Sequence, residues 1–237
     1  MIALLAALLV QDDAIDDAAR LHLVGRPDPG VVRETLEESG GVADVAFDDG
    51  DGSVTFRYKG KIAGLEAIEK KLTEKLEGIA KKGDPKKAVA AGAYLVSHVR
   101  MRFSLTAGSG SGADMDKLKR TLGEHRGVKK VLSISHSSLE MICDATQLWP
   151  PDLVAMAATC GFGGSARSHE LIEVRVAGDK WDALTRELNA VRNVLMVRVD
   201  PTGRLARILG RKGDVKDADL RASVEKAGMT LEQVRRP

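Results

Sequence analysis

The chain has 237 residues, a length that suits one large domain or two to three small ones. Hydrophobic residues make up 43% of it and aromatic residues only 3%, so any packed core must be built mainly from aliphatic side chains. The formal net charge is +2 with both signs interspersed, and this pattern gives no electrostatic case for a nucleic-acid partner.

The first ten residues are all apolar, and four acidic residues follow between Asp12 and Asp17. Such a run cannot span a bilayer, which needs about 20 apolar residues, but it matches the apolar region of a signal peptide. No lysine or arginine precedes it. We expect residues 1–17 to be a degenerate or truncated export signal, which would place the protein in the cell envelope or periplasm. The alternative is a short buried helix or a chain start chosen downstream of the true one. If the protein is not exported, it is expected to be cytoplasmic. No other segment is predicted to be transmembrane.

Residues 18–93 contain alternating strands, helical patterns and an Asp/Gly turn at 48–52. The predicted elements are, in order, a strand Arg20–Gly25, a helix Val31–Ser39, a hairpin Val42–Phe47 and Ser53–Tyr58, and a helix from Leu65 to about Lys81. The basic run 81–87 is interpreted as a solvated linker. Because Asp84 and Pro85 are typical of a helix start, Ala88–Tyr94 is either an extra helix or a final strand.

Residues 94–168 repeat this order. The predicted elements are a strand Val99–Leu105, a helix Asp114–His125, a hairpin turning near His136 and Ser137, and a helix Leu153–Thr159. A loop of five small residues precedes the first helix and could hold an anion on free backbone N–H groups: Gly108, Ser109, Gly110, Ser111 and Gly112. It lacks the lysine of a P-loop, so a flexible loop is the preferred interpretation.

Residues 169–237 repeat the order a third time. The predicted elements are a strand Leu171–Gly178, a helix Trp181–Val191, a hairpin Val194–Val199 and Arg204–Leu209, a helix Leu220–Lys226, and a short last strand Thr230–Arg235. The junction L-x-x-x-x-G/N-V-x-x-V recurs at Leu36–Val45, Leu122–Val131 and Leu188–Val197, which indicates three copies of one small unit.

The order β-α-β-β-α-β predicts an α+β fold of three tandem ferredoxin-like units, each with two helices on one face of a four-stranded antiparallel sheet. The other face of each sheet is left open, and polar residues therefore alternate along the strands. The pattern does not decide whether these open faces are solvated or packed between units.

The pattern resembles the heavy-metal-associated domain. The resemblance covers nearly all of residues 18–235. It rests on the glycine before the first helix, the repeated junction, and a closing helix that ends in Gly and an apolar residue, as at Gly161-Phe162 and Gly228-Met229. In that family a Met-x-Cys-x-x-Cys loop after the first strand binds a soft metal ion. The corresponding loops here, 25–30, 106–114 and 177–181, contain no Cys, Met or His. We therefore do not carry the metal site over, and we expect no cofactor.

The two cysteines, Cys143 and Cys160, are predicted to be buried thiols, because their placement disfavours a disulfide. His22 is predicted on the open, solvated face of its strand. His98 and His169 each precede a first strand and are expected to flank similar junctions between units, in surface roles. Together with the two cysteines, these two histidines are the remaining candidates for a metal site.

The first functional hypothesis is a non-catalytic binding or scaffold protein that recognises a protein or peptide through open sheet faces or edge strands. The alternatives are a metal-binding protein with non-standard His/Cys ligands, a small-molecule sensor and an enzyme. No catalytic residues can be proposed, because no set of nucleophile, base and orienting residue is specific in the sequence.

Overall fold

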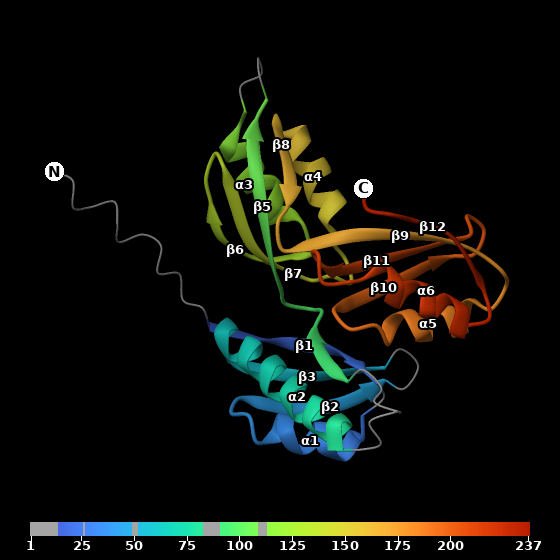
Figure 1. Cartoon of the computed structure of the whole chain (residues 1–237). Helices are drawn as coiled ribbons and strands as arrows, with labels where there is room; N and C mark the ends of the chain where they lie inside the picture. The colour runs from blue at the N-terminus through green and yellow to red at the C-terminus, as the bar shows by residue number, and fades with distance from the viewer. Residues whose placement is uncertain (1–13, 26, 49–51, 83–90, 109–112) are drawn as a thin grey trace.

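The computed structural model describes residues 14–25, 27–48, 52–82, 91–108 and 113–237. Within these ranges the chain forms six helices and three antiparallel sheets of four strands each (Figure 1). This mixed architecture is consistent with ferredoxin-like units. None of the described helices combines the length and the apolar character that crossing a membrane requires.

The elements fall into three groups in chain order. Unit 1 contains β1 Ala14–Val24, α1 Pro29–Glu37, β2 Val42–Asp48, β3 Ser53–Lys61, α2 Ile62–Lys82 and β4 Gly92–Leu95. Unit 2 contains β5 Val99–Ala107, α3 Met115–Glu124, β6 Val128–Ile134, β7 Ser138–Cys143, α4 Pro150–Thr159 and β8 Phe162–Ala166. Unit 3 contains β9 His169–Ala177, α5 Trp181–Asn189, β10 Val194–Asp200, β11 Leu205–Arg211, α6 Asp217–Lys226 and β12 Thr230–Arg235.

The three sheets share one strand order. It is β2-β3-β1-β4 in unit 1, β6-β7-β5-β8 in unit 2 and β10-β11-β9-β12 in unit 3. The first strand of each unit therefore lies in the interior of its sheet, and the second and last strands lie at its edges. An edge strand has neighbours on one side only, so its outer backbone groups can pair with another chain.

Two elements of unit 1 differ from the sequence prediction. β1 begins at Ala14 instead of Arg20, because Ala14–His22 pairs with Lys61–Ser53 of β3 although Asp16 and Asp17 interrupt the apolar alternation. Gly92–Leu95 is a strand that pairs with β1, so the described part of the ambiguous 88–94 segment is not a helix. The apolar run 1–10 lies outside the described residues.

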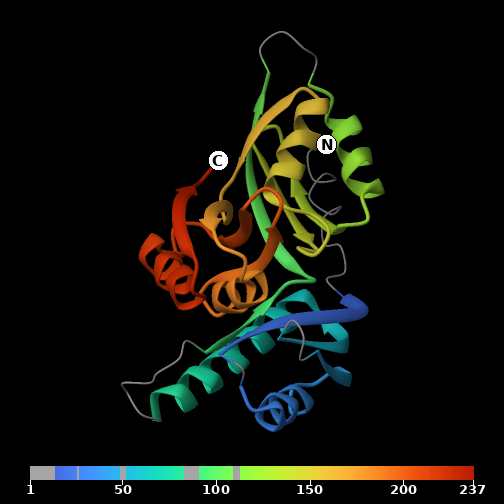
Figure 2. The same ribbon diagram turned by 90° about the vertical axis from the view of Figure 1, so that its right-hand side faces the viewer.

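The core of unit 2 extends into both neighbouring units. It contains Val24 and Tyr94 from unit 1 and Leu195 and Leu209 from unit 3, each nearly or fully buried. Units 1 and 3 have further clusters of their own. Only three residues separate β4 from β5 and only two separate β8 from β9. Figures 1 and 2 show units 2 and 3 packed side by side above unit 1.

Charged side chains also connect the units. Arg100 of β5 donates to Glu66 of α2 at 2.7 Å, and Lys129 of β6 donates to Asp17 of β1 at 2.8 Å. The backbone N–H of Asn193 in unit 3 donates to the hydroxyl of Tyr94 in unit 1 at 3.0 Å. Part of each open face is therefore covered by a neighbouring unit and is not solvated.

Candidate functional site

The family resemblance places the metal site in the loops that follow the first strands. Asp28 accepts a hydrogen bond from the N–H of Gly30 at 2.8 Å and caps α1, and Asp114 accepts from the N–H of Lys117 at 2.8 Å and caps α3. Both carboxylates thus satisfy helix N-termini, a role that suits aspartate. Among the described residues, no group of three or more His, Cys, Asp or Glu side chains is placed to hold a metal ion.

The two cysteines are free and buried. Burial, together with the negative charge of Asp144, raises the pKa of the Cys143 thiol to about 12. The thiolate is the form that binds soft metals and attacks electrophiles, and this thiol stays neutral near neutral pH. The Sγ of Cys160 lies 3.8 Å from the hydroxyl oxygens of Thr121 and Thr159. The arrangement fits two small buried side chains within the core of unit 2.

The surface positions expected for His98 and His169 are wrong, since their exposed fractions are 2% and 7%. Each follows a serine whose hydroxyl lies 2.9 Å from its Nδ1, Ser97 and Ser168 respectively. The two residues lie where unit 1 joins unit 2 and where unit 2 joins unit 3. Solvent exposure was expected here because the pattern of a single unit does not contain the packing of one unit on the next.

The two serines also repeat one backbone contact. Ser97 accepts the N–H of Arg20 on β1 at 2.8 Å, and Ser168 accepts the N–H of Arg102 on β5 at 3.0 Å. In both cases the acceptor lies just before the first strand of one unit and the donor lies on the first strand of the unit before it. The Ser-His pairs are therefore joints between units, and this packing accounts for their burial.

The solvent-exposed position predicted for His22 is also wrong. This residue is 7% exposed, and its Nε2 lies 2.9 Å from the carbonyl oxygen of Asn189 at the end of α5. The open face that carries His22 is covered there by unit 3.

The buried histidines predict acid sensitivity. Burial lowers the pKa of His169 to about 4, and the charge of Arg211 acts in the same direction. Burial lowers the pKa of His98 as well. The unfolded chain takes up these protons near a pKa of about 6.5, so the stability due to neutral histidine is complete above that pH and is lost as the pH falls towards about 4. Denaturant titration from about pH 7 to about pH 5 should show a loss of about 2 kcal/mol from His169 alone.

The control compares two variants at the same two pH values. His169→Gln should reduce the pH-dependent loss of unfolding free energy, whatever its effect at neutral pH. His136→Gln, in an exposed turn between β6 and β7, should leave the loss unchanged. Equal pH dependence in the wild type and in His169→Gln would contradict the assignment.

Of the predicted anion-binding loop 108–112, only Gly108 lies within the described residues. The N–H of Gly108 donates to the carbonyl oxygen of Gly161 at 2.9 Å, so this donor is already used within unit 2. Ser109, Gly110, Ser111 and Gly112 lie outside the described residues. Anion binding by this loop stays a prediction.

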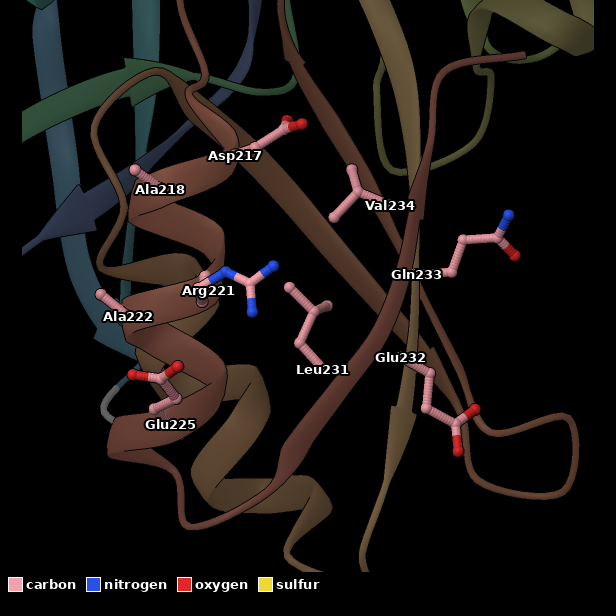
Figure 3. A pocket seen from close by; sticks show the side chains of 9 residues that line it. All are labelled: Asp217, Ala218, Arg221, Ala222, Glu225, Leu231, Glu232, Gln233 and Val234. Carbon is pink, nitrogen blue, oxygen red and sulfur yellow. The ribbon is translucent and has the colours of Figure 1, made fainter.

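A groove of about 590 Å³ runs between α6 and the edge strand β12 of unit 3. It is lined by five residues of α6 and four of β12: Asp217, Ala218, Arg221, Ala222, Glu225, Leu231, Glu232, Gln233 and Val234. Figure 3 shows Arg221 reaching from the helix towards Leu231, and Leu231 and Val234 pointing towards the helix. The side chains of Glu232 and Gln233 point away from it.

The two sides of the groove differ in chemistry. Leu231 and Val234 are half-buried and pack against the core of unit 3, so they form an apolar floor. Ala218 and Ala222 are exposed on α6, and their small side chains leave the space above that floor open. Asp217 forms an ion pair with Arg236. Glu225, Glu232 and Arg235 have no ion-pair partner among the described residues.

A bulge interrupts the pairing of β12 with β9. Val234 is opposite Val174 of β9 and Arg235 is opposite Glu173, but the register shifts between Leu231 and Gln233, so Glu232 is the extra residue of a bulge within the described ladder. β12 pairs with β9 only, so the groove opens along an unpaired sheet edge. The strand was predicted from the sequence, whereas the groove residues were not. Two alanines four residues apart on α6 were the available signal.

No family model matches the chain, and no curated protein matches it in sequence. Among solved structures, the N-terminal soluble domains of CopA from Bacillus subtilis align at 15% identity over 65% of this chain and 95% of that chain, with a TM-score of 0.35. The water-soluble region of the P-type ATPase CopA from the same organism aligns at 13% identity over 57% and 90%, with a TM-score of 0.32.

Aspartate kinase from Synechocystis aligns at 14% identity over 94% of this chain and 44% of that chain, with a TM-score of 0.28. All these TM-scores lie below 0.5, so the alignments indicate a loose likeness and carry no argument about function. The resemblance to the heavy-metal-associated domain therefore continues to rest on the sequence pattern.

Proposed function

We propose that this chain is a non-catalytic binding or scaffold protein built from three ferredoxin-like units of the heavy-metal-associated type, at about residues 18–93, 94–168 and 169–237. In this proposal the first loops of units 1 and 2 have exchanged the cysteine metal site for helix caps. Asp28 and Asp114 support that exchange, because each carboxylate is already engaged by the helix that follows it.

The observation that carries the proposal is the groove beside β12. It combines an unpaired strand edge with an apolar floor and a helical wall of small residues. An extended segment of a protein partner can add to such an edge, where main-chain hydrogen bonds supply affinity and side-chain pockets supply selectivity. Leu231 and Val234 of β12 pack against the core of unit 3, and this packed core supports the edge, since strand addition requires a scaffold that does not rearrange.

The test is a selection of random displayed peptides against a dilute solution of the full chain. We expect peptides that bind the wild type and bind Ala222→Trp at least about tenfold more weakly, because tryptophan fills the groove. The matched control is Ala155→Trp, since Ala155 is an exposed residue of α4 at the position that corresponds to Ala222. It should bind as the wild type does.

Both variants should keep the wild-type melting temperature, because both positions are exposed. If no peptide is enriched, or if the enriched peptides bind Ala222→Trp as tightly as the wild type, the groove is not the binding site and the proposal fails.

A further inference from the structure

We infer that the strand accepted at this edge is β12 of a second copy of the chain, so that two copies join their third sheets into one continuous sheet. The inference rests on the proposed function and names the partner of the same groove. It starts from the edge itself. β12 has one neighbour, β9, and an antiparallel pair of identical edges is closed by a two-fold axis, the commonest symmetry of protein dimers.

The register of such a pair is restricted by geometry. A two-fold axis perpendicular to the sheet keeps each side chain on its own face, so one residue must lie opposite its own copy. Val234 suits that position because it is half-buried, faces the groove and meets an identical apolar side chain. Gln233 of one copy then comes opposite Arg235 of the other.

Charge complementarity supports a second copy as the partner. Arg235 lies on the face of β12 that Gln233 shares, and Glu232 also points away from α6 because of the bulge (Figure 3). In the register centred on Val234, Arg235 of each copy lies next to Glu232 of the other, within reach of long side chains. The four unpaired charges of the two copies thus form two ion pairs in the dimer. Neither charge has an ion-pair partner among the described residues of the single chain.

The same charges explain why this edge does not pair indiscriminately. Charged side chains and a bulge at a sheet edge discourage association with unrelated strands. A negative and a positive residue placed three positions apart, on one face, are matched by an antiparallel copy of the same strand, whereas a strand without opposite charges at these positions leaves both unpaired. The alanines of α6 leave room for the second β12 beside the helix.

The test is the oligomeric state of the full chain, measured by sedimentation equilibrium over a concentration series. We expect a concentration-dependent dimer. Glu232→Arg and Arg235→Glu should each raise the dimer dissociation constant at least about tenfold, because each brings like charges together twice. An equimolar mixture of the two variants should form a heterodimer with an affinity close to that of the wild type, since every pair is again of opposite sign.

The doubly substituted chain, Glu232→Arg with Arg235→Glu, should form a homodimer again. Both side chains are exposed, so unchanged circular dichroism melting will show that the fold is intact in each variant. A wild-type chain that is monomeric at every concentration overturns the inference, and so does a dimer that neither charge reversal weakens. A monomeric chain that still yields groove-binding peptides would leave the proposed function standing. If the peptide selection and the sedimentation experiment both fail, neither the proposed function nor the second copy as partner stands.

Discussion

Replacing Gly41 with alanine is expected to lower the free energy of unfolding by about 3 kcal/mol, because this position combines a left-handed backbone with a neighbouring carbonyl oxygen that leaves no room for a Cβ. Gly41 has a φ of 84°, in the left-handed region that L side chains rarely adopt. A Cβ there would also collide with the carbonyl oxygen of Lys59. The N–H of Lys59 in β3 donates to the carbonyl oxygen of Gly41, the residue just before β2, at 2.8 Å, so relieving the collision would break this hydrogen bond.

The adjacent residue supplies the matched control. Gly40 is exposed, its φ lies outside the positive range, and a Cβ built on it would meet no atom within 4 Å. Gly40→Ala should therefore change the free energy of unfolding by no more than about 0.5 kcal/mol. Urea unfolding of both variants, followed by far-ultraviolet circular dichroism, measures the difference. Equal stability of the two variants would show that the junction does not hold the left-handed conformation.

The Gly/Asn position of the repeated junction has a different physical cause in different copies. Gly41 and Asn193 occupy the same position of two copies, and both have positive φ, at 84° and 66°. Asparagine is one of the few residues that tolerate that region, so the Gly/Asn exchange in the sequence had a backbone cause. Gly127, the corresponding residue of unit 2, is held by packing instead, since a Cβ there would lie 2.7 Å from the Cβ of Leu148.

Within a unit, strands and turns could be predicted because their signals are local. The alternation of Met101, Phe103 and Leu105 places these side chains on the buried face of β5, and the turn residues between β10 and β11 separate two alternating strands. The start of β1 was missed because its first residues, including Asp16 and Asp17, extend beyond the core, where pairing with β3 and not burial defines the strand.

Features that depend on packing between units could not be predicted. His22, His98 and His169 are buried by neighbouring units, and no single-unit pattern contains that information. The groove was missed for the same physical reason. β12 was predicted from its own sequence, but whether α6 covers its outer side or leaves it open is decided by the placement of the helix on the sheet.

Two adjacent residues of β11 belong to two different cores, one within unit 3 and one shared between units. Ile208 and Leu209 are both fully buried, but on opposite faces of the sheet. Ile208 belongs to the core of unit 3, whereas Leu209 belongs to the central cluster that contains Val24, Tyr94 and the core of unit 2. Truncation of either side chain to alanine should lower the free energy of unfolding by about 2–5 kcal/mol.

The two variants should differ in where the loss occurs. Leu209→Ala removes atoms from the surface where three units meet, so amide hydrogen exchange should accelerate in unit 3 and also at β4 and β5. Ile208→Ala should accelerate exchange in β9 to β12. In β4 and β5 it should not lower the opening free energy below the global free energy of unfolding of the variant. If both variants give the same exchange map, the central cluster does not couple the units. If the maps differ as expected, the three units unfold as a coupled body whose shared core passes through Leu209.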